Sequence, residues 1–154
     1  MSEKPRTRKP ICENRRARHE YEVLDTLEAG LCLVGSEVKS LRGGKGSVVE
    51  AYVKLEKGQA WLVDAHISPY DKANRFNHEP RAPRRLLLHK SEIVRWTRKT
   101  MEKGLTVVPL RMYFEGPWVK VEIALVRGKK LHDKRDAERE REDRREMDRA
   151  LRGR

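Results

Sequence analysis

Apolar and polar residues alternate in several short runs of the chain, and this period of two predicts a β-rich domain. The clearest run is residues 118–126, where four apolar residues at alternate positions would face a core and the charged residues between them would face solvent. Residues 51–55 and 61–67 show the same alternation on either side of Gly58, which predicts an antiparallel hairpin.

Residues 28–30 (EAG) are expected to form a turn between two of the other strands. Asp25 interrupts the alternation in the first of those strands, and Pro109 should lie at an edge or a bulge because proline has no N–H to donate. The additional strands are expected at residues 21–27, 31–34 and 105–110, and residues 86–88 should return to the core.

Two helices are predicted from their capping residues and their apolar spacing. Ser36 is a suitable N-cap for residues 37–42, and Gly43 follows them. Ser91 is placed in the same way before residues 92–102, where apolar residues fall on one helical face. Residues 68–85 contain three prolines and little periodicity, so we expect a loop there.

These elements together predict a mainly β fold. We expect an OB-like antiparallel β-barrel with flanking short helices and a charged C-terminal tail. The domain limits would be a disordered basic arm at 1–10, an RNA-binding barrel at 11–131 and the tail at 132–154, which would be disordered or, when bound, helical.

The positive charge of the chain is concentrated in the predicted barrel. The whole chain has a net charge of +12, but residues 132–154 contain nine Lys or Arg and eight Asp or Glu, so the rest carries +11. A basic folded body suits a polyanion such as nucleic acid. A basic surface that serves solubility alone is the alternative that composition leaves open.

Patterns for catalysis, metal binding or nucleotide binding are missing from the sequence. The five histidines show no ligand spacing with either cysteine, and the glycine-rich residues 43–47 lack the spacing of a phosphate loop. We therefore expect no enzyme activity, no metal and no cofactor. Cys12 and Cys32 belong to no disulfide framework, which predicts reduced thiols in the cytoplasm, and no apolar run is long enough to span a membrane.

The segment 14–21 (NRRARHEY) places three arginines, a histidine and a tyrosine within eight residues. Asn14 would cap a short helical turn, and Tyr21 would begin a strand. Such a segment suits an RNA-facing edge, since arginine contacts phosphates and an imidazole or phenol ring stacks on bases or hydrogen-bonds. A solvated charged turn explains the segment equally well at this point.

Six blocks of the sequence resemble the signature blocks of the small protein B (SmpB) family, the bacterial SsrA-binding proteins. They follow in family order from about residue 11 to residue 135, and together they are specific. The blocks are NRRARHEY (14–21), EAG (28–30), GSEVKSLR (35–42), SPY (68–70), RLLLH (85–89) and RGKKLHDKR (127–135). The resemblance implies an OB-like barrel, no catalysis and no required metal, and we expect a monomer.

The resemblance also implies that the barrel holds the transfer-RNA-like domain of transfer-messenger RNA near its elbow. Glu28 would accept hydrogen bonds from base amino groups or ribose hydroxyls, and so contribute selectivity rather than affinity. The RNA contacts implied by family positions are Asn14, His19 and Glu28, with Tyr21, Lys39 and Arg42, and the charge pattern adds Arg15, Arg16 and Arg18.

The resemblance implies a second partner, the ribosome, for the tail. The tail would lie in the empty messenger channel of a stalled ribosome, with His132 near the decoding centre. Positions needed for tagging but not for RNA binding are Gly128, Asp133, Lys134 and Arg135, beside the cations Lys129 and Lys130. Relatives often carry a tryptophan near the place of Asp143, whereas this tail has no aromatic residue. The alternative function is that of a general tRNA- or rRNA-binding barrel.

Overall fold

The computed structural model describes residues 7–71, 77–101, 104–128, 144, 145 and 147. Its strands are β1 (Arg8–Glu13), β2 (Tyr21–Leu31), β3 (Gly46–Ser47), β4 (Tyr52–Glu56), β5 (Gln59–Val63), β6 (His66–Ile67), β7 (Arg84–Leu87), β8 (Leu105–Glu115) and β9 (Trp118–Gly128). Its helices are α1 (Arg15–Glu20), α2 (Gly35–Arg42) and α3 (Lys90–Thr100).

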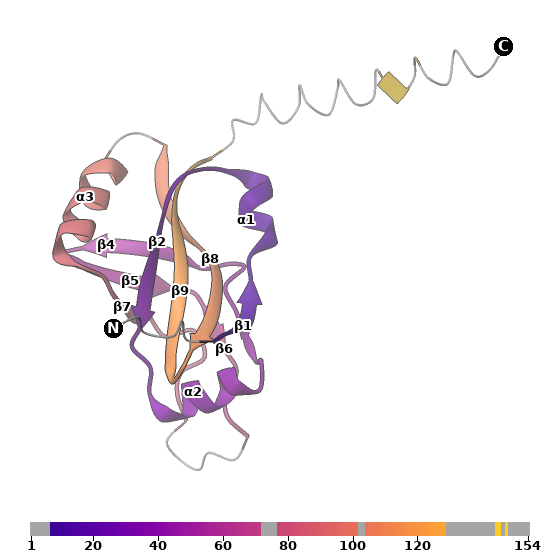
Figure 1. Ribbon diagram of the computed structural model, residues 1–154, viewed down its shortest axis with the longest axis vertical. Coiled ribbons are helices and arrows are strands. Elements are labelled where there is room, and N and C mark those ends of the chain that lie inside the picture. The colour runs from indigo at the N-terminus through magenta and orange to yellow at the C-terminus, as the bar shows by residue number, and fades with distance from the viewer. Residues whose placement is uncertain (1–6, 72–76, 102–103, 129–143, 146, 148–154) are drawn as a thin grey trace.

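The main sheet closes on itself and forms an antiparallel barrel. Its strand order is β1-β8-β4-β5-β7-β2-β9, and β8 also pairs with β9, so six strands form a ring and β1 is added outside it on β8. In Figure 1, α1 and α3 flank the barrel on opposite sides near one end, and α2 lies near the opposite end. The mainly β, OB-like barrel predicted from the alternation is confirmed.

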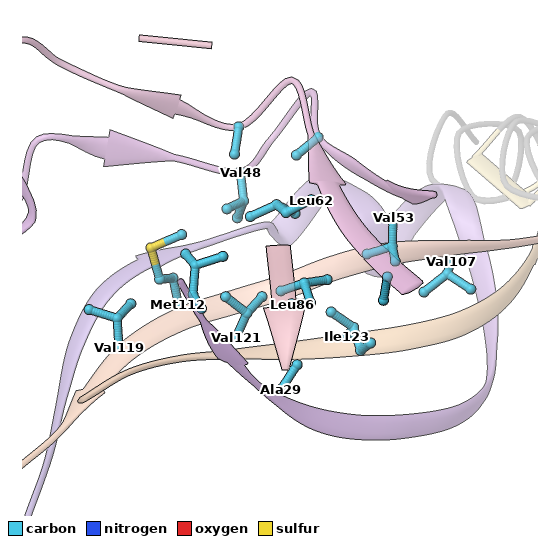
Figure 2. Close-up of a cluster of buried hydrophobic side chains, with 14 of the residues drawn as sticks. Ala29, Val48, Val53, Leu62, Leu86, Val107, Met112, Val119, Val121 and Ile123 are labelled. Atoms are coloured by element: carbon cyan, nitrogen blue, oxygen red, sulfur yellow. The ribbon is translucent and has the colours of Figure 1, made fainter. Parts of the chain in front are cut away.

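The barrel interior is filled by the inward-facing residues of the strands. Val119, Val121, Ile123 and Leu125 of β9 are all buried in this core, as their alternation predicts. Figure 2 shows β9 side chains meeting those of facing strands, among them Leu62 and Leu86. A second, smaller core lies beneath α1. It consists of Ala17, Val108, Leu110, Ala124 and Val126, with Tyr21 packed against it.

Strand β2 is longer than the sequence predicts, because the EAG segment is not a turn. Gly30 continues the strand and pairs with Leu87 on one side and Lys120 on the other. A Cβ at this position would lie 3.4 Å from the Leu87 Cβ, which is ordinary van der Waals contact, so Gly30 acts here as a normal strand residue. The strand expected at residues 31–34 is also wrong, since β2 ends at Leu31.

Two irregularities in the strands follow the sequence closely. The β2–β9 register shifts between Val23 and Asp25, where the alternation breaks. The β8–β9 register shifts between Pro109 and Arg111, as expected for a proline that cannot donate to the ladder. The run 61–67 is also divided, because Asp64 has a φ of 63° and residues after it form β6, which pairs with β3.

Helices α2 and α3 begin earlier than predicted, and neither Ser36 nor Ser91 is the N-cap residue. The cap residues are Val34 and His89. Their backbone N–H groups donate to Glu37 and Glu92 respectively, each at 3.0 Å. Each glutamate therefore accepts from the N–H of its cap residue, which is the glutamate half of a capping box. The N–H of each glutamate donates in turn to the carbonyl oxygen of the cap residue, at 3.1 Å for Val34 and 3.0 Å for His89.

The N-terminal boundary also differs from the prediction. Strand β1 begins at Arg8, so residues 8–10 belong to the sheet, although the sequence placed them in a disordered arm. Arg8 and Lys9 pair with Glu115 and Phe114 of β8. Residues 1–6 lie outside the described part of the chain.

A buried ion pair fixes α2 to the barrel and to the loop before β7. Arg84 and Glu37 are 4% and 5% exposed, and the Arg84 Nε donates to Glu37 Oε2. The same guanidinium donates to the carbonyl oxygens of Ala65, Glu79 and Pro80, at 2.8, 3.2 and 3.1 Å. The loop is therefore tied to the barrel by one charged side chain whose polar atoms are satisfied.

The two cysteines are expected to differ in reactivity. Burial raises the pKa of Cys12 to about 11, with backbone hydrogen bonds to Val48 and Met112 opposing this effect, while Cys32 is exposed. Because the thiolate is the reactive form, iodoacetamide at pH 8 should alkylate Cys32 and leave Cys12 unmodified until the protein unfolds. Mass spectrometry of the peptides measures this, and equal rates for both thiols in the native protein would contradict it.

Candidate nucleic-acid interface

Asn14 fixes the start of α1. Its Oδ1 accepts a hydrogen bond from the backbone N–H of Ala17 at 3.2 Å, as the predicted cap requires. Its Nδ2 donates to the carbonyl oxygens of Val48 at 3.3 Å and Pro109 at 3.1 Å. The side chain is only 3% exposed, so its polar atoms are used inside the protein and it orients α1 on the barrel.

Replacing Asn14 by alanine should weaken both the fold and the start of α1. We expect a loss of about 2 kcal/mol in the free energy of unfolding, because one helix cap and two buried hydrogen bonds disappear. Urea unfolding followed by circular dichroism measures the loss. The variant Arg15→Ala, one residue later and exposed, serves as control and should stay within about 0.5 kcal/mol of the parent protein. Equal stability of both variants would contradict the structural role of Asn14.

The outer face of α1 presents the cations that the sequence singles out. Arg15, Arg16, Arg18 and His19 are all exposed, and Ala17 alone of this helix is buried. Arg16 donates to Glu20 at 2.8 Å, and this hydrogen bond raises the pKa of Arg16 further. Within the described part of the chain, no side-chain hydrogen bond or ion pair involves Arg18 or His19. Both are therefore available to a ligand.

Tyr21 joins α1 to the barrel. It is the first residue of β2, is half-buried against the second core, and pairs with Gly128, the last residue of β9. It also lines a pocket of about 270 Å³ between α1 and the segment 49–52.

Glu28 belongs to a polar cluster on the outer face of the barrel. Its Oε2 accepts from Arg8 Nη2 at 3.1 Å and from the hydroxyl of Tyr113. Glu122 lies directly across the β2–β9 ladder from Glu28, and Arg111 donates to it from Nε at 3.0 Å. The guanidinium carbons of Arg8 and Arg111 lie 5.0 and 5.2 Å from the centre of the Tyr113 ring.

This environment has a clear effect on Tyr113. Burial raises the pKa of the Tyr113 hydroxyl, and the hydrogen bond to Glu28 and the charge of that carboxylate raise the pKa further. Arg8 and Arg111 lower the pKa by a smaller amount. The phenol is therefore a hydrogen-bond donor at neutral pH, and it holds the carboxylate of Glu28 in place.

Lys39 and Arg42 lie on α2, away from α1. The Lys39 ammonium is 5.6 Å from the centre of the Tyr70 ring, and the Arg42 guanidinium carbon is 5.1 Å from that of Phe114. Figure 1 shows α1 and α2 toward opposite ends of the barrel, with β1 between them. Strand β1 leads into α1 and contacts β3, which follows α2 in the chain. The structure thus separates the predicted contacts into two groups.

The sequence prediction missed four residues near this face. Arg8 was placed in the arm, and Arg111, Tyr113 and Lys120 are outward-facing residues of β8 and β9. Lys120 lies directly across the ladder from Tyr113. The available signal was the alternation itself, because residues opposite the buried positions of β9 must lie outside the barrel. The bulge after Pro109 hides the same signal in β8.

Only one of the predicted tail residues is described by the structure. Gly128 ends β9, whereas Lys129, Lys130, His132, Asp133, Lys134 and Arg135 lie outside the described residues. Farther along, Arg144, Arg145 and Met147 are described as helical and exposed. Among the residues with described positions, no three His, Cys, Asp or Glu side chains gather as a metal site would require. No helix in these ranges is both long enough and apolar enough to cross a bilayer.

Comparison with protein families gives a match over almost the whole chain. The model of the family described as SmpB protein matches residues 11–153. The chain belongs to the SmpB protein family. This confirms the resemblance drawn from the six sequence blocks, and the matched range includes the barrel, both groups of predicted contacts and most of the tail.

The chain is similar to several curated SmpB relatives, each described as an SsrA-binding protein. It is 56% identical to that of Desulforudis audaxviator over 94% of this chain and 95% of the relative. The identity is 57% with the protein of Symbiobacterium thermophilum, over 94% and 92% of the two chains, and 52% with that of Nostoc sp., over 98% of each.

A solved structure also resembles the chain. It is described as "tmRNA-SmpB: a journey to the center of the bacterial ribosome", and its matching chain is 49% identical, with a TM-score of 0.67. The match covers 79% of this chain and 86% of that one. The barrel fold of this chain is therefore similar to that of an SmpB chain.

Proposed function

We propose that this chain binds the transfer-RNA-like domain of transfer-messenger RNA and delivers it to stalled ribosomes, so that the unfinished peptide is tagged. The observation that carries the proposal is the family match over residues 11–153, joined to relatives described as SsrA-binding proteins. The similar solved structure is described as tmRNA-SmpB in the bacterial ribosome, which supports both partners. Such an adaptor acts in the cytoplasm, where translation takes place, and we expect it to act as a monomer.

The barrel, which begins with β1 at Arg8, is the part that holds the RNA. Arg15, Arg16, Arg18 and His19 on α1 supply cations and an imidazole to the RNA backbone and bases, while Lys39 and Arg42 on α2 form a second group of contacts. Tyr21 and Glu28 lie on β2, beside α1 and on the outer barrel face. Because Asn14 is buried, its contribution is indirect: it holds α1 in the position from which the arginines reach the RNA.

The tail, residues 132–154, has a separate task in this proposal. It enters the messenger channel of a ribosome whose message has ended, with His132 near the decoding centre. Gly128, Lys129, Lys130, Asp133, Lys134 and Arg135 form the junction that directs it there. The near balance of charge in the tail fits a segment that occupies a defined channel better than one that adheres to any RNA.

The adaptor task needs no chemical step, and we assign no catalytic residue, metal or cofactor. Binding energy comes from phosphate contacts, which release counterions and depend steeply on salt. Selectivity must come from groups other than phosphates, since every RNA offers those. The family is an RNA-binding family, and the +11 charge of the body suits that task.

Competition at a fixed salt concentration tests this function against that of a general tRNA- or rRNA-binding barrel. Labelled transfer-messenger RNA is bound to the full chain and then displaced with unlabelled transfer-messenger RNA, bulk tRNA or rRNA fragments. The adaptor should prefer transfer-messenger RNA by at least about a hundredfold, because specific contacts add to the shared phosphate term. Equal displacement by all three RNAs would favour the general RNA-binding protein, for which the basic body alone would be sufficient.

A further inference from the structure

Helix α3 has a basic outer face that includes none of the predicted RNA contacts. The apolar side of the helix is buried through Ile93 and Trp96. The opposite side carries four cations, Lys90, Arg95, Arg98 and Lys99. Together with Ser91 and Val94, these cations line a shallow groove of about 640 Å³. We refer to these six residues as the basic face of α3.

Most of the charge on this face has no partner within the described part of the chain. No ion pair or side-chain hydrogen bond between described residues involves Lys90, Arg98 or Lys99. Arg95 alone approaches a carboxylate, with its Nη2 3.7 Å from Oδ2 of Asp25. The basic face of α3 therefore keeps a positive charge that its described neighbours do not neutralise.

Helix stability explains only part of this arrangement. Cations near the C-terminus of a helix interact favourably with its dipole, which accounts for Arg98 and Lys99 in the last turn. Lys90, however, is the first residue of α3, where a positive charge opposes the dipole. Arg95 and Lys99 are four residues apart, a spacing at which like charges repel each other. These two unfavourable placements favour an anionic partner that offsets them.

The position of α3 indicates which polyanion would meet this face. Helices α1 and α3 lie on opposite sides of the barrel near the same end (Figure 1). After α3 the chain enters β8 at Leu105, which pairs with Arg127, and β9 ends one residue later at Gly128. The face thus belongs to the end of the barrel from which the tail departs, while the predicted contacts with transfer-messenger RNA lie on α1, α2 and β2.

From this charge and position we propose that the basic face of α3 binds the phosphate backbone of ribosomal RNA beside the channel that the tail enters. Lys90 and Arg98 are about 12 Å apart along the helix axis, which is long enough to face several phosphates of one strand. Contacts of this kind position a protein without reading bases. The role rests on the proposed function and adds a second RNA surface, separate from the one for transfer-messenger RNA.

The double variant Lys90→Gln with Arg98→Gln tests this surface, because glutamine removes the charge and is nearly as good a helix former. Binding of the full chain to ribosomes stalled on a truncated message is measured by pelleting, without transfer-messenger RNA. We expect the affinity to fall about tenfold, and the plot of log affinity against log salt to become less steep by roughly 1.5–2. Affinity for transfer-messenger RNA, measured by filter binding, should stay within about twofold of the parent protein.

The control variant Lys9→Gln with Lys45→Gln removes two exposed cations from β1 and from the segment after α2. It should leave ribosome affinity within about twofold of the parent protein. An equal loss in the control would mean that only net charge matters. An equal loss of affinity for transfer-messenger RNA in Lys90→Gln with Arg98→Gln would assign α3 to that RNA. Either result, or unchanged ribosome affinity in this variant, would overturn the proposal.

Crosslinking identifies the partner in the complete complex. Val94 is 41% exposed within the groove, so a benzophenone amino acid in its place should react with whatever covers the face. We expect crosslinks to ribosomal RNA, reduced in the Lys90→Gln with Arg98→Gln background. Crosslinks only to a ribosomal protein or only to transfer-messenger RNA would contradict the proposal. Failure of the proposed function gives a different result: the competition experiment would show no preference for transfer-messenger RNA, whatever the crosslink.

Discussion

A chain that ends at Leu131 is expected to bind transfer-messenger RNA within about twofold of the full chain, because the missing residues carry almost no net charge and few phosphate contacts are lost. Tagging of peptides on stalled ribosomes should fall to background. The barrel closes its sheet and its core with residues of the ranges 7–71, 77–101 and 104–128, without the tail, so it should fold normally after truncation. Filter binding and a tagging reaction in a reconstituted translation system, run on the same preparations, measure both quantities.

A full-length variant serves as the matched control for this truncation. Replacing Asp133, Lys134 and Arg135 together by alanine keeps the length of the tail and fourteen of its seventeen charged residues. We expect the same division, with RNA binding retained and tagging lost, because these positions belong to the junction that directs the tail. A strong loss of RNA binding in the truncated chain would contradict the separation of the two tasks.

Replacing Arg84 by leucine is expected to have the largest effect on stability. It leaves the Glu37 carboxylate buried without its partner, which costs about 3–5 kcal/mol in the free energy of unfolding. Because small domains have roughly 5–15 kcal/mol in total, the variant should unfold at a much lower temperature or urea concentration. The carbonyl groups of Ala65, Glu79 and Pro80 lose their donor as well.

The neighbouring residue gives a close control for Arg84→Leu. Arg85 is exposed on the opposite face of β7, and Arg85→Leu should change the free energy of unfolding by less than about 0.5 kcal/mol. The double variant Glu37→Leu with Arg84→Leu should regain part of the lost stability, since no buried charge remains. An Arg84→Leu variant as stable as Arg85→Leu would show that the ion pair adds nothing to the fold.

The sequence predicts the barrel well because its evidence is local. Alternation in β9, the Gly58 hairpin and the effects of Asp25 and Pro109 depend on neighbouring residues, and the structure confirms each of them. Gly30 misleads, since it continues β2 and pairs with Leu87 and Lys120 on two other strands. These partner residues are distant from Gly30 in the sequence, so the sequence alone does not distinguish this glycine from one in a turn.

The candidate interface also has one part that the sequence predicts and one part that it does not. The arginines of α1 are found from composition alone, because a short exposed helix displays whatever cations it contains. The Glu28 cluster could not be found this way, since Arg8 and Tyr113 come from strands 20 and 85 residues away in the chain. Their meeting depends on the order β1-β8-β9-β2 across the outer face, which periodicity does not determine.

The pairing of Tyr21 with Gly128 has a consequence for how the two tasks are linked in space. Tyr21, which follows α1, and Gly128, which ends β9 before the tail, are partners on adjacent strands of a closed sheet. Cross-strand partners lie about 5 Å apart at their Cα atoms, and closure of the ring prevents the two strands from sliding. The starting point of the tail is therefore fixed relative to the bound RNA, so docking of one would set the position of the other without any change in the shape of the barrel.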